Sequence, residues 1–250
     1  MSLERLVEIM RRLRDPKSGC EWDSVQTFAT IAPYTIEEAY EVADAVARDD
    51  MDALADELGD LQLQVVFHAQ MAEDAGHFTL DNVLARICDK MERRHPHIFG
   101  DAEHDGHHLW EIIKAEERAA DPDKSALAGV ALALPALERA AKLQRRAART
   151  GFDWPDISGP RAKIDEELAE LEAETDHDGK LDELGDLLFA VVNFARHLNI
   201  EPETALREAN RKFEKRFRAI EQTPGFSDLS LDEMEALWVA AKAAQAAPSD

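Results

Sequence analysis

The sequence predicts an all-α protein, on three observations. Apolar residues recur three and four positions apart along most of the 250 residues, which places them on one face of a helix. Only 11 glycines and 10 prolines interrupt the chain, which favours long helices over many short strands. No segment carries a convincing strand pattern. At roughly 150 residues per domain, the chain forms one large domain or two small ones.

The apolar spacing predicts ten helices, near residues 2–14, 31–48, 52–75, 79–94, 107–119, 134–149, 160–174, 179–198, 202–221 and 230–246. Pro16 ends the first helix, because proline cannot donate a backbone hydrogen bond. Thr35 followed by Glu38 resembles a capping box, in which two side chains bond each other's backbone at a helix start. Pro202 and Pro224 bracket the ninth helix.

The charge balance excludes several classes of partner. The chain has 52 acidic and 29 basic residues and a net charge of −23, which argues against binding to nucleic acid or an anionic membrane. It fits a chain that binds cations, or phosphates through cations. Cys20 and Cys88 build no disulfide framework, and no uncharged run is longer than that from Ser125 to Leu137, which is too short to span a bilayer. The first residues lack the apolar stretch of a signal peptide, so we expect a cytoplasmic protein.

An internal repeat divides the chain. Residues 56–69 (DELGDLQLQVVFHA) and 182–195 (DELGDLLFAVVNFA) are identical at nine of 14 positions, at an offset of 126. Upstream, residues 35–42 match residues 164–171 at an offset of 129. The repeat predicts a duplication, with a first copy at 1–118, a linker at 119–133 and a second copy at 134–250.

Each repeat carries the acidic pattern E-E-x-x-E on one predicted helix and E-x-x-D on the next. The first set is Glu37, Glu38, Glu41, Glu57 and Asp60, and the second is Glu166, Glu167, Glu170, Glu183 and Asp186. Positions three apart share a helix face, so antiparallel helices would bring four carboxylates together. Such a group repels itself unless a cation is bound, and oxygen ligands without histidine suit Mg²⁺ or Mn²⁺ better than Zn²⁺. A single such pair would suit a solvent-facing helix, but the full pattern occurs twice, which favours a metal site.

These motifs resemble the MazG family of nucleoside triphosphate pyrophosphohydrolases. The supporting stretches are WDSVQTFATIAPYTIEEAYEV, DKMERRHPHIF, WEIIKAEER, KLQRRAARTGFDW and LDEMEALW. The resemblance implies tandem four-helix-bundle-like domains assembled as a homodimer. It implies Mg²⁺-dependent cleavage of ribo- and deoxyribonucleoside triphosphates to monophosphate and pyrophosphate, in a housecleaning or stress role.

The resemblance also implies roles for individual residues of the second repeat. By this resemblance, Glu167, Glu170, Glu183 and Asp186 bind Mg²⁺, for which Mn²⁺ is a substitute. Glu166 or a neighbouring carboxylate is then the general base. The residues expected to contact substrate are Lys163, Lys180, Asn210, Lys212, Arg216 and Trp238. Trp238 either stacks on the base or belongs to the core.

The two repeats differ where phosphate would bind. Tyr34 stands at the position of Lys163, and Cys88 stands opposite Asn210. We therefore expect the second repeat to be the main catalytic site. The first repeat keeps its acids, so Glu38, Glu41, Glu57 and Asp60 form a second metal site or a structural remnant.

Other functions stay open at this point. The same fold would suit a dUTPase-like or phosphoribosyl-ATP-specific enzyme. A regulator that binds nucleotides without turnover would keep the acids but lose the reaction, and a purely structural helical protein would bind no metal. The preferred base and sugar and the number of metal ions do not follow from the sequence.

Overall fold

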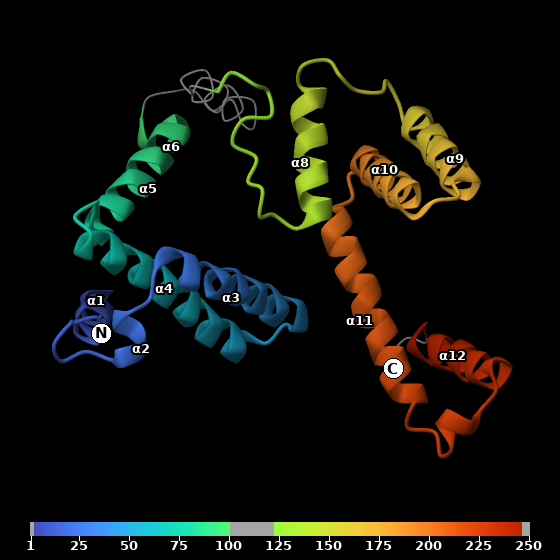
Figure 1. The fold of residues 1–250 in the computed structure, drawn as a ribbon, viewed down its shortest axis with the longest axis horizontal. Helices are drawn as coiled ribbons and strands as arrows, with labels where there is room; N and C mark the ends of the chain where they lie inside the picture. The colour runs from blue at the N-terminus through green and yellow to red at the C-terminus, as the bar shows by residue number, and fades with distance from the viewer. Residues whose placement is uncertain (1–2, 101–122, 247–250) are drawn as a thin grey trace. The chain divides into compact units, whose positions relative to one another are not determined.

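The computed structural model describes residues 3–100 and 123–246, and these residues form helices and no strand, as predicted (Figure 1). Contacts divide the chain into two compact units, Met1–Glu117 and Arg118–Asp250. None of the described helices is both long and apolar enough to cross a membrane.

Unit 1 is built around a pair of long helices. Its elements are α1 Leu3–Leu13, α2 Glu21–Ser24, α3 Phe28–Arg48, α4 Met51–Asp74, α5 Leu80–Arg94 and α6 Pro96–Phe99. Asp49 closes α3 in the left-handed conformation (φ 55°), and Asp50 caps α4 by accepting a bond from the Ala53 backbone. This tight connection folds α4 back along α3, and α1 packs against α4. The pair carries the first acidic set.

The start of α3 corrects one prediction. Thr27 is the N-cap, and its side chain and that of Thr30 form the capping box. The predicted capping box of Thr35 and Glu38 is wrong, because both residues lie inside the helix. The Thr35 hydroxyl instead lies 3.0 Å from Nε2 of His68 on α4. The single-turn helices α2 and α6 were not predicted, since one turn leaves no periodic signal. The predicted helix at 107–119 falls outside the described residues.

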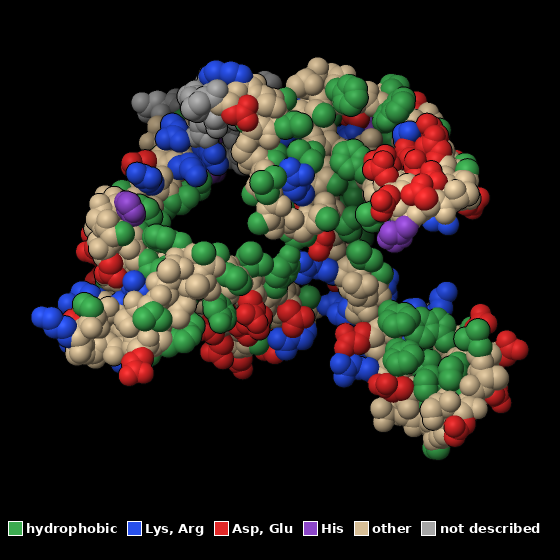
Figure 2. All heavy atoms as spheres, in the orientation of Figure 1, with side chains coloured by type: hydrophobic (Ala, Val, Ile, Leu, Met, Phe, Trp, Pro, Cys, Tyr) green, Lys and Arg blue, Asp and Glu red, His purple; other side chains and the backbone are tan. Residues whose placement is uncertain are grey.

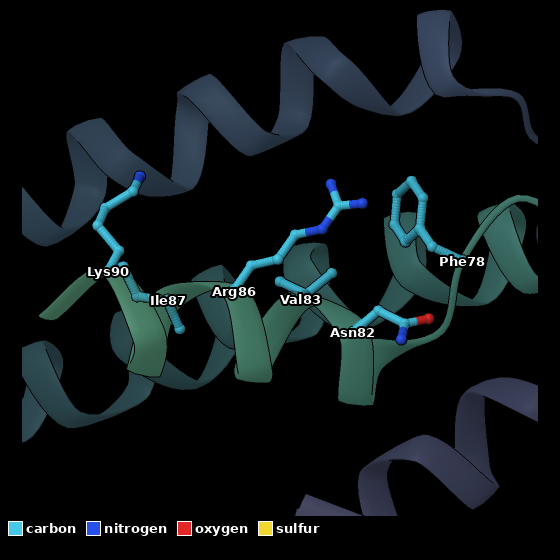
Figure 3. Close-up of a pocket in the computed structure, with 6 residues that line it drawn as sticks. All are labelled: Phe78, Asn82, Val83, Arg86, Ile87 and Lys90. Atoms are coloured by element: carbon cyan, nitrogen blue, oxygen red, sulfur yellow. The ribbon is translucent and has the colours of Figure 1, made fainter. Parts of the chain in front are cut away.

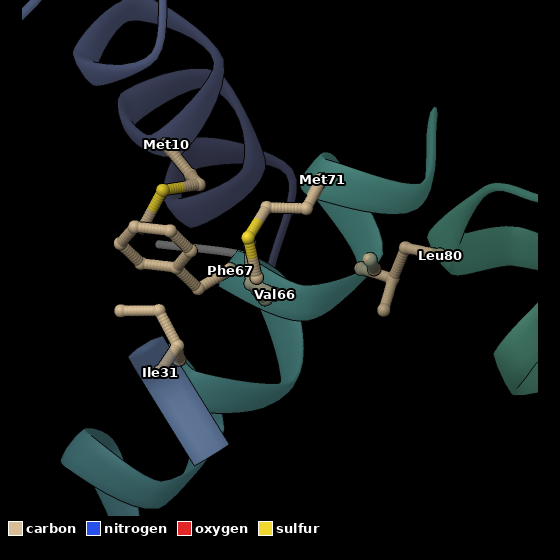
Figure 4. Close-up of a cluster of buried hydrophobic side chains, with 7 residues drawn as sticks. Met10, Ile31, Val66, Phe67, Met71 and Leu80 are labelled. Carbon is tan, nitrogen blue, oxygen red and sulfur yellow. The ribbon is translucent and has the colours of Figure 1, made fainter. Parts of the chain in front are cut away.

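Unit 1 has a compact apolar core where α1, α3 and α4 meet (Figure 4). Its buried side chains are Met10, Ile31, Val66, Phe67, Ala69, Met71 and Leu80. Trp22 closes the edge of this core, with its ring 6.4 Å from the Phe67 ring and 6.1 Å from that of Tyr34.

Unit 2 contains a second pair of antiparallel helices. Its elements are α8 Ala136–Ala148, α9 Ser158–Ala173, α10 His177–His197, α11 Pro202–Ile220, the 3-10 helix η1 Phe226–Asp228 and α12 Leu231–Ala246. Asp176 caps α10 by accepting from two backbone N–H groups, and Asn199 ends it with a φ of 57°. Helix α8 packs against α10, and α12 packs against α11. The short turn before Asp176 brings α9 alongside α10, and this pair carries the second acidic set.

Candidate active site

Three carboxylates of the second set converge between α9 and α10. Glu167 and Glu170 on α9 and Glu183 on α10 each offer an oxygen within 4.8 Å of the others. Glu167 is only 3% exposed, which is unusual for a glutamate without a full set of partners. Figure 2 shows the acidic side chains gathered over this helix pair. The predicted meeting of E-x-x-E with E-x-x-D is therefore present for three of the four acids.

Asp186 lies one turn further along α10 and stands outside this group of three. It still acts on the group through its charge. The pKa of Glu183 is raised by partial burial and then by the charges of Glu170, Glu167 and other nearby acids, Asp186 among them. A raised carboxyl pKa means that negative charge is concentrated here without enough compensation. The cluster thus favours a cation.

Lys163 supplies part of that compensation. Its ammonium lies 2.5 Å from an oxygen of Glu167 and 2.9 Å from an oxygen of Glu166. These two bonds, the one to Glu167 first, raise the pKa of Lys163 above its ordinary value. Glu166 is exposed and points its carboxylate to the lysine on the rim of the cluster. The lysine is therefore charged and placed beside the carboxylates of the cluster.

The first acidic set forms a similar cluster in unit 1. Oxygens of Glu38, Glu41 and Glu57 lie within 4.8 Å of one another, and Asp60 stands outside the three. Burial, followed by the charge of Asp60, raises the pKa of Glu38. Tyr34 occupies the position that Lys163 holds in unit 2. Both sets can therefore hold a cation, but only the second has a lysine at this position.

A cavity of about 680 Å³ opens beside the second cluster. Its lining includes Lys163, Glu167 and Asp186 of the acidic centre, and also the aromatic side chains of Phe152 and Trp154. This volume is within the range of small-molecule sites. A ligand in this cavity would meet carboxylates and a lysine together with aromatic rings.

The predicted contacts on α11 and α12 lie in a different part of unit 2. Arg216 donates to the Gln245 side chain at 2.9 Å, and its guanidinium lies 5.7 Å from the Trp238 ring. The Trp238 ring packs 5.2 Å from that of Phe213. Lys212 and Asn210 are exposed on α11, and Lys180 is exposed in the first turn of α10. Among the described residues, no recorded contact joins these side chains to the carboxylates.

Two amide side chains in the cavity wall, Gln144 and Asn193, were not predicted from the sequence as site residues. The signal available was a difference between the repeats, since Asn193 replaces Phe67 within the nearly identical segment. A second hollow, of about 420 Å³, lies in unit 1 (Figure 3). Helix α5 and Phe78 line it with no acidic residue, so it is no counterpart of the acidic site.

Comparison with known proteins identifies the family. Residues 26–99 match the MazG nucleotide pyrophosphohydrolase domain, and this stretch contains the first acidic set. The chain is 50% identical over 250 residues to the nucleoside triphosphate pyrophosphohydrolase of Escherichia coli K12, covering 94% of this chain and 95% of that protein. It is 45% identical over 231 residues to the nucleoside triphosphate pyrophosphohydrolase/pyrophosphatase MazG of Thermotoga maritima, covering 92% and 90%. The Mycobacterium tuberculosis nucleoside triphosphate pyrophosphohydrolase is 34% identical over 213 residues, covering 83% of this chain and 61% of that protein. Together with the paired acidic helices, this similarity shows that the chain belongs to the MazG family of nucleotide pyrophosphohydrolases.

Proposed function

We propose that this chain hydrolyses nucleoside triphosphates to nucleoside monophosphate and pyrophosphate, at the acidic centre of α9 and α10. The observation that carries the proposal is the meeting of Glu167, Glu170 and Glu183 within 4.8 Å, beside a cavity large enough for a nucleotide. The 50% identity to an enzyme named for this reaction supports it.

The donor set fits Mg²⁺ or Mn²⁺. All three converging ligands are carboxylate oxygens, and the burial of Glu167 leaves a negative charge that needs a partner. A bound divalent cation would neutralise triphosphate charge and make a coordinated water more acidic. Glu167, Glu170 and Glu183 would hold it, with Asp186 one turn away.

The chain's own residues supply the remaining steps. Lys163 can contact phosphate oxygens, because its charged ammonium already lies at the edge of the cluster. Glu166 or a neighbouring carboxylate accepts the proton of the attacking water. A bond then forms between the water oxygen and phosphorus, the bridging bond between the α and β phosphates breaks, and pyrophosphate leaves. Lys212 and Arg216 lie on α11, away from the carboxylates. They would contact the leaving group only if α11 changed its position or if a second copy of the chain supplied them.

A homodimer agrees with the apolar surface of unit 2. Large apolar side chains on α9 and α10 are 43–49% exposed, at Leu168, Leu184, Leu188, Phe189 and Val191. Leu184, Leu188 and Val191 lie three and four positions apart on one face of α10, and an exposed apolar face of this kind is typical of an interface. We propose that the two units are copies of one ancestral domain, that unit 2 carries the main activity and that unit 1 is weaker or structural.

Product analysis tests the reaction. The full-length protein is incubated with ATP, CTP, GTP, UTP and their deoxy forms, with Mg²⁺ and then with excess chelator, and phosphorus NMR identifies the products. Monophosphate and pyrophosphate, formed only with the metal, are expected. Diphosphate and phosphate would mean a different hydrolase. Nucleotide binding with no product would favour a regulatory module.

A further inference from the structure

The hollow of unit 1 is formed by one face of α5 and by a phenylalanine that stands just before this helix. Its volume of about 420 Å³ is within the range of small-molecule sites. Its lining residues are Phe78, Asn82, Val83, Arg86, Ile87 and Lys90. Asn82, Arg86 and Lys90 are four positions apart and therefore form one row along the helix. Figure 3 shows Phe78, Arg86 and Lys90 pointing to the same side of α5.

Two cations in this row have no anionic partner. Among the residues that the structure describes, neither the guanidinium of exposed Arg86 nor the ammonium of half-buried Lys90 makes a recorded hydrogen bond or ion pair. Elsewhere in the chain, Arg48 and Arg218 each bind an acid one turn earlier on their own helix. One turn before Arg86 stands the neutral Asn82, and one turn before Lys90 stands Arg86, so this row offers no such acid. In a chain with a net charge of −23, the hollow is therefore a local site of positive charge.

Asn82 adds a third hydrogen-bond donor. Its Oδ1 accepts from the backbone N–H of Thr79 at 3.0 Å and from the Thr79 hydroxyl at 3.1 Å, in the capping box that starts α5. These two bonds fix the orientation of the amide and leave Nδ2 as its remaining group, for which the described part of the chain shows no recorded acceptor. All three polar side chains of the hollow thus present donors and no free acceptor, which is the chemistry of an anion site.

The rest of the lining is apolar and open to solvent. Phe78 is 38% exposed and Ile87 is 44% exposed, and Val83 lies between them on the same face. A small hydrated anion on the two cations would leave these side chains uncovered. A ligand that also has a planar or apolar part would cover them, and such a part packs well against an aromatic ring.

The second repeat does not have this site. The offset of 122 that aligns Lys90 with Lys212 places Glu208 at the position of Arg86, and alanines at the positions of both aliphatic residues of the hollow. Glu208 pairs with Arg211 on its own helix, at 2.6 Å. An acid in place of the arginine would repel an anion, so the donor row and its apolar surface are features of unit 1 alone.

We propose that the hollow on α5 binds a phosphate monoester with a planar organic part, with the phosphate between Arg86 and Lys90 and the planar part against Phe78 and Ile87. A phosphate monoester carries close to two negative charges and three acceptor oxygens, which match two cationic side chains. Nucleoside monophosphates have this chemistry, and inorganic phosphate shares its charged part. The inference does not rest on the proposed function, because no carboxylate of either acidic set lines the hollow.

Calorimetry of the full-length protein in excess chelator tests the site. The chelator removes divalent cations, so the acidic centres repel a phosphate ester instead of binding it. The ligands are AMP, adenosine and inorganic phosphate, the last measured by its displacement of AMP. We expect AMP to bind the wild-type protein with a Kd of about 1 mM or lower, and adenosine and inorganic phosphate to bind at least about fivefold more weakly.

Four variants locate the binding. Arg86→Gln and Lys90→Gln should each weaken AMP binding at least about fivefold, because each removes a charged donor. Phe78→Ala should weaken AMP binding about threefold and leave the affinity for inorganic phosphate unchanged, because the ring contacts only the organic part. Arg12→Gln, at an exposed arginine on α1, is the matched control and should keep the wild-type affinity for AMP.

No AMP binding up to about 5 mM, or equal AMP affinity in Arg86→Gln and wild type, would overturn the proposal. Inorganic phosphate that binds as tightly as AMP would refute the organic part of the ligand. Sedimentation velocity of the same proteins tests the other occupant of an exposed face, a second copy of the chain. Dissociation of a dimer in Arg86→Gln, with no displacement of that dimer by AMP, would assign the hollow to the second copy and overturn the proposal. Each result is independent of pyrophosphate release, since a chain that hydrolyses nothing can still bind AMP here.

Discussion

The ammonium of Lys163 lies 2.5 Å from Oε1 of Glu167, the most buried carboxylate of the acidic centre in unit 2. In the absence of a metal, this contact is part of what offsets the charge of the cluster. On the proposed function, the lysine would compete with a divalent cation for Glu167 and would become available to phosphate once a cation took its place. The same residue would then oppose metal binding and favour substrate binding.

Lys163→Met should separate these two effects. Without nucleotide, Mn²⁺ affinity should rise, by up to about tenfold, because a positive charge beside the site is removed. With nucleotide, KM should rise, because a phosphate contact is lost. Electron paramagnetic resonance of free Mn²⁺ gives the first quantity, and pyrophosphate release gives the second. Arg161→Met, which breaks an exposed pair with Asp165 on the same helix, is the control. Weaker Mn²⁺ binding in Lys163→Met would contradict the assigned competition.

The loop before α9 depends on an ion pair. Asp153 binds Arg196 through both oxygens, and these bonds, followed by the contact with His197, hold the pKa of Asp153 below its ordinary value. A carboxylate whose pKa is lower in the folded protein stabilises the fold above its unfolded pKa, and the stabilisation is lost as pH falls through the folded value.

Asp153→Asn should therefore lower the free energy of unfolding at pH 7, by about 1 kcal/mol, because the bond to Arg196 is charge-assisted but Asp153 is an exposed residue. The difference in the free energy of unfolding between wild type and Asp153→Asn should shrink below pH 4, where the wild-type carboxyl begins to protonate. Urea unfolding at pH 7 and at pH 3 measures this difference at each pH. Asp228→Asn, at an exposed position, should change neither value. If the difference in the free energy of unfolding between wild type and Asp153→Asn grew on acidification, the result would contradict a lowered pKa for Asp153 in the folded protein.

Gly159→Ala should disturb the cavity without touching a polar group. The new Cβ would lie 2.4 Å from the Trp154 ring, so the indole must move. We expect higher acrylamide quenching of the Trp154 fluorescence, measured as the difference from the same variant in a Trp154→Phe background, and a KM raised several-fold. Gly59→Ala places its Cβ in open space inside α4 and should stabilise by about 1 kcal/mol, with unchanged quenching. Quenching that stays at the wild-type level in Gly159→Ala would show that the ring is not held as described.

Met10→Ala tests whether the two units are independent. Met10 is 1% exposed in the core of unit 1, and removal of its side chain should cost about 2–5 kcal/mol of that unit's stability. Pyrophosphate release should persist at temperatures where unit 2 stays folded. Ile9→Ala, one residue earlier and 41% exposed, should cost much less. Parallel loss of turnover and of unit 1 structure would contradict a catalytic site confined to unit 2.

Helix positions followed from the sequence because apolar spacing is a local property. Helix α10 was expected at 179–198 and is found at His177–His197, and Asn199 ends it in the left-handed conformation that asparagine tolerates. The Thr35 capping box failed because Thr27 and Thr30 provide a competing pair earlier in the chain, and Thr35 finds His68 across the helix pair.

The acidic centre was predictable in part. The E-x-x-E spacing placed Glu167 and Glu170 on one face, but the position of Asp186 outside the group of three depends on how α10 is rotated against α9. The cavity could not be predicted, because it exists only through contacts among α8, α9, α10 and the loop at Trp154. In the sequence, the cavity was indicated only by the difference between Phe67 of the first repeat and Asn193 of the second. The packing of the helices is needed to show that a cavity lies beside Asn193.

Two matched substitutions decide whether the acidic centre of unit 2 cleaves the substrate: Glu167→Gln, and Glu38→Gln at the aligned glutamate of unit 1. Both are measured in full-length protein with nucleoside triphosphate and Mg²⁺. We expect pyrophosphate release to fall at least about a hundredfold in Glu167→Gln, while Glu38→Gln keeps most of it. Loss in Glu38→Gln with near-normal release in Glu167→Gln would contradict this expectation and move the reaction to unit 1.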